Sequence, residues 1–348
     1  MYCSKGAIML DWNDGYITEI GYTYGYYTEL NPLRVQFAFL NRGLAFPNIK
    51  TACELGFGQG MSINIHAAAS DIEWYGTDFN AAQASFAQNV AKESGAHVKL
   101  YDNSFEDFRL RDDLPDFDYI GLHGIWSWIS DENKPYIVDF INKKLKVGGV
   151  LYISYNVYPG WGTIAPIRHL MSEYAQTNGE KGHGILGNVQ DAVSFVDKFL
   201  NVNSAFSRVN PNVKPRFENM KIHDSHYIAH EYFNGYWTPI YFSEMANWLS
   251  QAKLDYACSA HYIDHVDAVN ISAEQQTLLN EYKDTFFHET LRDFIVNQQF
   301  RRDYWVKGAR RLNLYSQKEE LRKQRFILTS PRDVVKLKVT GAQGEATL

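Results

Sequence analysis

Residues 53–60 read Cys-Glu-Leu-Gly-Phe-Gly-Gln-Gly and join a predicted strand, Thr51–Leu55, to a predicted helix, Gly60–Ala69. Glycines are expected where a ligand approaches the backbone closely or where φ must be positive. The spacing G-x-G-x-G differs from the dinucleotide fingerprint G-x-G-x-x-G, in which a pyrophosphate sits on the helix N-terminus. Here an acid, Glu54, precedes the first glycine. An acid there favours a ligand with a positive group, such as the amino group of S-adenosylmethionine, over a dinucleotide.

A second acid strengthens this interpretation. Asp78 follows the predicted strand Glu73–Thr77, twenty residues after Gly58. A carboxylate at this strand end can accept hydrogen bonds from both ribose hydroxyls. After a third strand, His97–Tyr101, the segment Asp102–Phe105 falls where an adenine edge would lie. The turn and the two acids together predict a cofactor site, whereas a tight turn that binds nothing is the structural alternative.

The surrounding pattern predicts an α/β fold. Short apolar runs alternate with helical stretches across residues 51–156, which is typical of a parallel sheet covered by helices on both faces. We therefore expect a Rossmann-like, doubly wound sheet with a helical insertion and a following helical domain. The remaining expectations are strands at Asp118–His123, Val150–Tyr155, Tyr227–Phe233, Leu254–Tyr262, Phe326–Leu328 and Val334–Val339, and helices at Asn80–Ser94, Glu132–Leu145, Phe242–Ala252 and across 157–225 and 272–325.

The predicted domain boundaries follow from this pattern. They are an aromatic N-terminal arm or lid over 1–44, a catalytic domain over 45–262 with its insertion at 157–225, a helical regulatory region over 263–330, and the truncated start of a further domain over 331–348. The lid rests on five tyrosines within twelve residues: Tyr16, Tyr22, Tyr24, Tyr26 and Tyr27.

Composition excludes several classes of protein. The 348 residues are 45% hydrophobic with a net charge of −6, which indicates a globular chain and argues against nucleic-acid binding. The three cysteines are far apart, so we expect no disulfide framework and a cytoplasmic protein. No signal peptide is visible. The uncharged run Val147–Ile167 is long enough to span a membrane, but its glycines and prolines favour a buried strand and a turn.

The chain resembles the class I S-adenosylmethionine-dependent methyltransferases. More narrowly, it resembles those with a methyltransferase regulatory domain, including the rickettsial outer-membrane-protein lysine methyltransferases. The motifs that carry the narrower resemblance are Phe117–Ile120, His123–Trp128, Gly148–Asn156, Tyr158–Trp161, His230–Tyr232, Pro239–Phe242 and the region around Phe294 and Phe300-Arg301. The resemblance covers about residues 16–330.

The resemblance implies S-adenosylmethionine as cofactor, S-adenosylhomocysteine as product, and roles for matching residues. His123 and Gly124 follow the fourth strand, where sulfonium and nucleophile meet in such enzymes. The residues expected to bind the cofactor are Glu54, Gly56, Gly58, Gly60, Asp78, Phe79, Ser104, Phe105, His123, Gly124 and Tyr26.

Methyl transfer to an amine also requires a neutral nucleophile. Burial in an aromatic channel would lower the pKa of a substrate lysine from its reference value of about 10.4. Aromatic residues follow the fourth and fifth strands, and we predict His123, Tyr155 and Trp126 as catalytic, with packing in the core as the alternative for the two aromatics. The pairs His230-Glu231 and His261/His265 are expected to be structural, and no metal site is predicted. The basic run Arg301–Arg311 is interpreted as a solvated helix face.

Three functional classes remain open at this stage. The first is a methyltransferase acting on lysine side chains of a protein. The second is an O-methyltransferase acting on a small molecule or glycan, which uses the same cofactor site. The third is a non-enzymatic module that senses S-adenosylmethionine. A homodimer formed through the helical region 272–325 is a further hypothesis.

Overall fold

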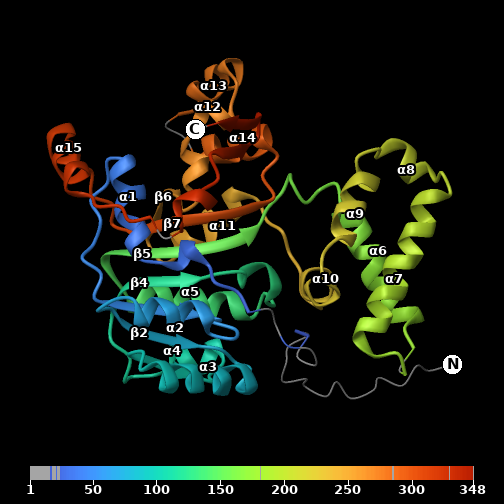
Figure 1. Ribbon diagram of the computed structural model, residues 1–348, viewed down its shortest axis with the longest axis horizontal. Helices are drawn as coiled ribbons and strands as arrows, with labels where there is room; N and C mark the ends of the chain where they lie inside the picture. Colours follow the sequence, from blue (N-terminus) through green and yellow to red (C-terminus); the bar gives the residue numbers. More distant parts are fainter. Residues whose placement is uncertain are drawn as a thin grey trace. The chain divides into compact units, whose positions relative to one another are not determined.

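The computed structural model describes residues 16–17, 21, 24–180, 182–283, 286–328 and 330–347. The chain divides into two compact units (Figure 1). The sheet unit combines residues 25–126, 133–161 and 239–348, and the helical unit combines residues 162–238 with 127–132 and the described part of 1–24. Each unit is described separately.

A seven-stranded sheet forms the centre of the sheet unit, with strand order β3-β2-β1-β4-β5-β7-β6. The first five strands are parallel, whereas β7 runs antiparallel to both of its neighbours. Their bounds are β1 Thr51–Leu55, β2 Glu73–Thr77, β3 Val98–Tyr101, β4 Phe117–Leu122, β5 Leu145–Asn156, β6 Leu254–Ser259 and β7 Phe300–Lys307. The predicted doubly wound α/β class is confirmed.

Helices follow the parallel strands as the alternating pattern predicts. They are α2 Met61–Ala68, α3 Ala81–Ser94, α4 Phe105–Arg109 and α5 Asn133–Lys144. Asn80 is the N-cap of α3, since its side-chain oxygen accepts hydrogen bonds from the N–H groups of Ala82 and Gln83. Buried side chains of the strands and helices, including Ile63, Trp74 and Tyr119, form a continuous core. This core holds the parallel strands together, so that their carboxyl ends lie at one edge of the sheet.

The expectation of helix across 272–325 is wrong at β7. Five of its eight residues are buried, among them Tyr304, Trp305 and Val306, as expected of a strand with neighbours on both sides. Two charged residues, Arg301 and Asp303, hide the strand signal in the sequence. They share one face of the strand and pair with each other, so neither is a solvated charge.

Short helices surround the β6–β7 end of the sheet (Figure 1). They are α11 Phe242–Ser250, η3 Tyr262–His265, α12 Asp267–Asn270, α13 Ala273–Asn280 and α14 Phe287–Val296. Further along the chain lie α15 Leu314–Lys323, η4 Arg332–Val334 and the hairpin of β8 Lys338–Gly341 and β9 Gly344–Thr347, while η1 Thr28–Leu30 and α1 Leu33–Asn41 precede the sheet. The strand expected at Phe326–Leu328 is absent, and β8 begins four residues after Val334.

The helical unit contains α6 Ala165–Asn178, α7 Gly184–Asn201, α8 Ala205–Val209, α9 Val213–Lys221 and α10 Ser225–Tyr232. The rings of Tyr174 and Phe195 stack between α6 and α7 with centroids 4.4 Å apart. The strand expected at Tyr227–Phe233 is instead part of α10, whose first turn is capped by the Asp224 carboxylate at the N–H of His226. Among the described residues, no helix is both long and apolar enough to cross a membrane.

Candidate cofactor site

The glycine turn after β1 has the backbone that its sequence predicts. Gly56, Gly58 and Gly60 have φ values of 73°, 57° and 70°, a region that side-chain-bearing residues rarely adopt. A Cβ atom on Gly60 would also overlap that of Ala87 on α3. Gly60 is therefore required both for the turn and for the close packing of α2 against α3.

Asp78, at the end of β2, is bonded directly to this turn. Its Oδ2 accepts a hydrogen bond of 2.8 Å from the Gly58 N–H, and its Oδ1 accepts one of 3.0 Å from the Asn80 N–H. The side chain is buried, and this burial raises its pKa to about 6 despite both hydrogen bonds. Each carboxylate oxygen retains a lone pair, so the group can still accept hydrogen bonds from a pair of hydroxyls.

Glu54 provides a second buried carboxyl beside the turn. It is 3% exposed, and burial together with the Asp78 charge raises its pKa well above the usual range. Its Oε2 has no hydrogen-bond partner among the described residues. Because an orphaned buried acceptor costs free energy, this atom is suited to a ligand that brings a donor or a positive charge.

The expected adenine side of the site lies at the ends of β2 and β3. Ser104 is the N-cap of α4, where its Oγ accepts from the Asp107 N–H at 3.1 Å. Thr77 Oγ1 donates to the Asn103 carbonyl at 2.5 Å and ties the two strand ends together. Phe79 and Phe105 are both partly buried here. Contact of these residues with a nucleoside stays a prediction.

His123 lies at the end of β4, on the same edge of the sheet. Its ring stacks on Tyr27 with centroids 3.9 Å apart, and its Nδ1 is 2.7 Å from the Tyr152 hydroxyl. Burial lowers the pKa of His123 to about 4, so the imidazole is neutral at physiological pH. The next residue, Gly124, has a φ of 65° and donates its N–H to Ser154 Oγ at 2.8 Å.

The tyrosine cluster contacts His123 through Tyr27, and a cofactor contact by Tyr26 stays a prediction. Tyr26 is 48% exposed and contacts His66, with centroids 5.3 Å apart. Tyr27 is the tyrosine that stacks on His123, and its N–H donates to Ser62 Oγ at 2.8 Å. The tyrosine cluster in the sequence indicated that a tyrosine would reach the site. The spacing of the tyrosines alone does not show which ring points inward. Tyr22 lies outside the described residues.

The two aromatic residues predicted as catalytic are fully buried. Trp126 packs edge-on against Trp248, with centroids 5.6 Å apart. Tyr155 donates its hydroxyl proton to Asp303 Oδ2 at 2.7 Å. Both positions match the core alternative considered above, and a catalytic role for either residue stays a prediction.

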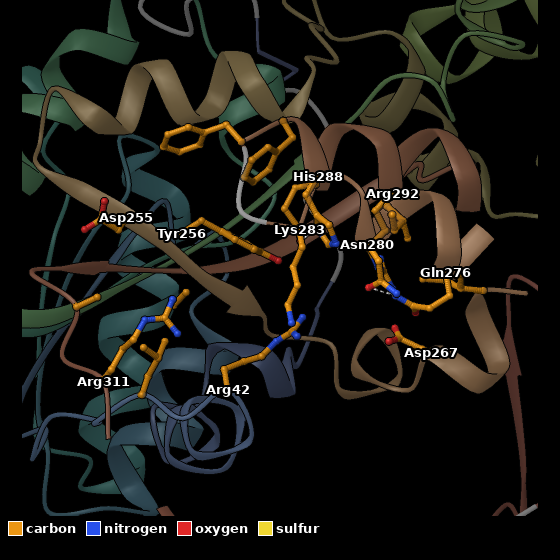
Figure 2. Close-up of a pocket in the computed structure, with 18 residues that line it drawn as sticks. Arg42, Asp255, Tyr256, Asp267, Gln276, Asn280, Lys283, His288, Arg292 and Arg311 are labelled. Carbon is orange, nitrogen blue, oxygen red and sulfur yellow. Dashed lines mark hydrogen bonds and ion pairs between the residues drawn. The ribbon is translucent and has the colours of Figure 1, made fainter. Parts of the chain in front are cut away.

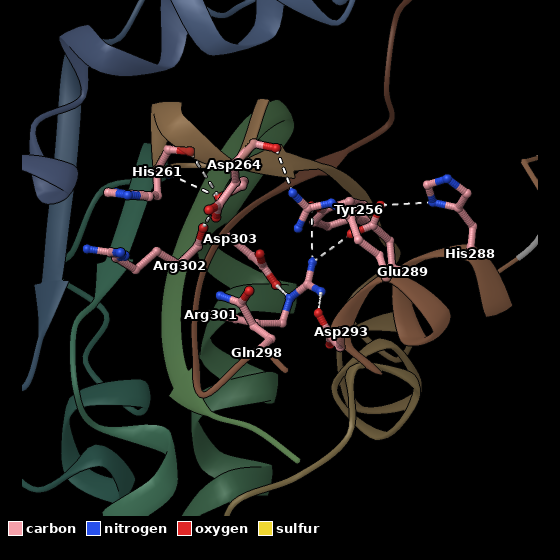
Figure 3. Close-up of polar contacts among 12 residues, drawn as sticks. Tyr256, His261, Asp264, His288, Glu289, Asp293, Gln298, Arg301, Arg302 and Asp303 are labelled. Atoms are coloured by element: carbon pink, nitrogen blue, oxygen red, sulfur yellow. Dashed lines mark hydrogen bonds and ion pairs between the residues drawn. The ribbon is translucent and has the colours of Figure 1, made fainter. Parts of the chain in front are cut away.

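The partner of Tyr155 belongs to a buried ion cluster that the sequence did not reveal (Figure 3). The Arg301 guanidinium, which is 4% exposed, bonds Asp303 at 2.8 Å, Asp293 at 2.6 Å and Glu289 at 2.9 Å. It therefore links β7 to α14. Burial raises the pKa of Asp293 to about 7, although the neighbouring Arg301 acts in the opposite direction. Interpretation of Arg301 as part of a solvated helix face is wrong.

The histidine pairs have structural partners. His265 Nε2 lies 2.7 Å from the Ser259 carbonyl, and His261 Nδ1 lies 3.6 Å from Glu29. In the helical unit, His230 Nε2 is 3.3 Å from the Gly21 carbonyl. Within the described part of the chain, no group of three or more His, Cys, Asp or Glu side chains is arranged to hold a metal ion.

The strand order of the sheet and the geometry of the glycine turn are together those of a class I methyltransferase fold. Residues 224–307 match the family model described as a predicted methyltransferase regulatory domain. The uncharacterized protein sll1526 of Synechocystis is 42% identical over 97% of this chain and 67% of its own length. The chain therefore belongs to one family with that protein, and it combines a class I methyltransferase fold with a match to this regulatory-domain model.

Two rickettsial proteins extend the comparison. The structure of PKMT2 from Rickettsia typhi in complex with AdoHcy has a TM-score of 0.73 at 22% identity, over 91% of this chain and 61% of that one. The uncharacterized protein RP789 of Rickettsia prowazekii is 23% identical over 89% of this chain and 56% of its own length. The chain thus spans about three fifths of the length of these rickettsial proteins.

Proposed function

We propose that this chain binds S-adenosylmethionine at the carboxyl ends of β1, β2 and β4 and transfers its methyl group to a substrate. The observation that carries the proposal is the pair of buried carboxyls, Glu54 and Asp78, on either side of a glycine turn. A tight turn that bound nothing would gain no stability from a buried, unpartnered Glu54 oxygen. The structure of PKMT2 in complex with AdoHcy supports the same choice of cofactor.

Residue roles follow from the chemistry of each group. Asp78 would accept the ribose hydroxyls, and Glu54 would accept a hydrogen bond from the amino group of the cofactor, whose positive charge would favour the ionised carboxylate. The glycine turn leaves room for the cofactor backbone, and partly buried Phe79 and Phe105 would flank its base. When bound, the cofactor supplies a methyl group activated by a sulfonium, so the protein must mainly align the nucleophile and exclude water.

His123 is suited to orienting the nucleophile. A neutral imidazole can hydrogen-bond an incoming amine or hydroxyl without adding a positive charge beside a sulfonium. Its ring is held by Tyr27 on one face and by Tyr152 at Nδ1, so its direction is fixed before substrate arrives. Tyr27, with its hydroxyl-bearing ring over His123, would help to exclude water.

For the substrate, we propose lysine side chains of a protein. The resemblance to rickettsial lysine methyltransferases supports this choice, as do the aromatic rings beside His123, because burial of an amine among poorly solvated rings lowers its pKa. O-methylation of a small molecule or glycan is the second candidate, because nothing in the cofactor site distinguishes the two nucleophiles.

One labelling experiment separates these substrates. The protein is incubated with cell extract and cofactor carrying a radioactive methyl group, and labelled protein is hydrolysed and analysed for methyllysine. We expect base-stable label in methyllysine, and less of it with the Asp78→Ala variant at a cofactor concentration that does not saturate the wild type. Label confined to small molecules or polysaccharide would reject the lysine proposal in favour of O-methylation.

A further inference from the structure

The sheet unit contains a cavity of about 930 Å³ beside α13, α14 and β6 (Figure 2). None of the residues assigned above to the cofactor site lines it. Its volume is within the range of cavities that hold small-molecule ligands, about 300–1,000 Å³. The cavity is therefore large enough for a metabolite, which would bind apart from the proposed cofactor site.

Positive charge gathers around this cavity from separate parts of the chain. Arg42 follows α1, Lys283 follows α13, and Arg311 lies beyond β7. All three are exposed, and no acidic side chain among the described residues forms an ion pair with them. In Figure 2 the side chains of Arg42 and Lys283 extend toward the middle of the cavity. Like charges brought together in this way repel each other unless an anion lies between them.

The acids of the cavity wall do not cancel this charge. Glu289 is already paired with Arg301 at 2.9 Å and with His288 at 3.2 Å. Asp255 and Asp267 are exposed. The cavity is also lined by four cationic residues, which outnumber these two acids: Arg42, Lys283, Arg311 and Arg292. The Arg292 guanidinium donates to the Asp264 carbonyl at 2.8 Å. The cavity thus carries an excess of cationic groups.

We propose that this cavity binds a small phosphate-bearing molecule, held by Arg42, Lys283 and Arg311. Guanidinium groups bind phosphate through paired hydrogen bonds, and an ammonium adds a compact charge. Tyr256 and the 72% exposed ring of Phe286 also line the cavity and offer apolar surface to the rest of the molecule. The proposal does not depend on the proposed methyl transfer.

Contacts between side chains connect the wall of this cavity to the central sheet. Glu289 forms part of its wall and also holds Arg301, whose partner Asp303 accepts the Tyr155 hydroxyl on β5. Three contacts, from Glu289 to Arg301, from Arg301 to Asp303 and from Asp303 to Tyr155, thus connect the wall of the cavity to a strand of the central sheet.

Calorimetric titration with pyrophosphate and with ribose 5-phosphate, at constant ionic strength, tests the proposal. Ribose is the matched ligand without phosphate. The test variant is Arg42→Gln combined with Lys283→Gln. The control variant is Arg325→Gln combined with Lys92→Gln, because these exposed residues lie outside the cavity. Both variants are also titrated with S-adenosylhomocysteine and melted thermally to show that they are folded.

We expect the wild-type protein and the control variant to bind both phosphate ligands and not ribose. The test variant should bind them at least tenfold more weakly, and its melting temperature without ligand should not fall. Absence of phosphate binding by the wild-type protein, or equal affinity in the test and control variants, would overturn the proposal. Binding of citrate but not of the phosphate ligands would also overturn it, since the site would then select carboxylates.

Discussion

Asp78 and Gly58 are joined by a hydrogen bond of 2.8 Å from the glycine N–H to the carboxylate Oδ2. The acid proposed to bind the ribose therefore also holds the glycine turn in shape. The Asn80 N–H donates to the other carboxylate oxygen, Oδ1, at 3.0 Å. Asn80 is also the N-cap of α3. A change at Asp78 should consequently affect both the turn and the cofactor, and the experiments below separate these effects.

Gly60→Ala should destabilise the protein more than Gly95→Ala. The two glycines have nearly equal φ values, 70° and 69°, so each alanine incurs a similar backbone cost of about 1–2 kcal/mol. At Gly60 the new Cβ also overlaps Ala87. A Cβ added at Gly95 would have no such neighbour within 4 Å. We expect an additional loss of about 1–3 kcal/mol at Gly60 from overpacking, measured by urea denaturation. Equal losses would show that α2 and α3 can move apart freely.

The raised pKa of Asp78 predicts a pH dependence of stability. Because the pKa of Asp78 in the folded protein, about 6, exceeds its ordinary value of 3.8, the folded state keeps a proton that the unfolded state has lost. The free energy of unfolding should therefore fall as pH rises from about 4 to about 6, by at most about 3 kcal/mol from this group.

Denaturation of Asp78→Asn and of Asp71→Asn over this pH range isolates the effect. Asp71 is exposed and serves as the matched acid. The difference in unfolding free energy between wild type and Asp78→Asn should change with pH, and Asp71→Asn is measured beside it as the exposed control. A pH-independent difference for Asp78→Asn would contradict the raised pKa.

Arg301→Met should be far more damaging than Arg310→Met. The first change leaves Asp293 and Asp303 buried without their counter-charge, which costs about 3–5 kcal/mol. Arg310 is exposed, and its change should stay within about 0.5 kcal/mol of zero. Thermal or urea unfolding of both variants measures this. A loss below about 1 kcal/mol for Arg301→Met would mean that the cluster contributes little to the fold.

His123 should remain neutral from pH 5.5 to pH 8, because burial lowers its pKa to about 4. The ring nitrogen shifts of His123, followed by NMR and assigned with the His123→Phe variant, should stay constant over this range. The exposed ring of His169 provides an internal comparison in the same spectra. A titration midpoint for His123 between pH 6 and 7 would contradict its proposed role as a neutral hydrogen-bonding group.

The parallel half of the fold could be predicted because its signals are local. Apolar runs, the Asn80 cap and the three glycines each reflect a backbone requirement within a few residues. The β7 strand was missed because its signal is not local. Arg301 and Asp303 are compatible with a buried strand only through Asp293, Glu289 and Tyr155, which lie elsewhere in the sequence.

The site shows the same division. Glu54 and Asp78 were predictable from their distances to the glycine turn along the chain. The stacking of Tyr27 on His123 and the burial of Trp126 against Trp248 depend on long-range packing, for which residue type alone gives no direction. The cationic cavity was also hidden, since Arg42, Lys283 and Arg311 are brought together by the fold.

Calorimetric titration of S-adenosylmethionine into the wild-type protein, Asp78→Ala and the exposed-acid control Asp71→Ala tests the proposed cofactor site most directly. We predict binding to the wild type and to Asp71→Ala, and affinity at least tenfold weaker for Asp78→Ala, a loss of about 1.4 kcal/mol or more. No binding to the wild type, or equal affinity in Asp78→Ala, would contradict the assignment of this site to S-adenosylmethionine.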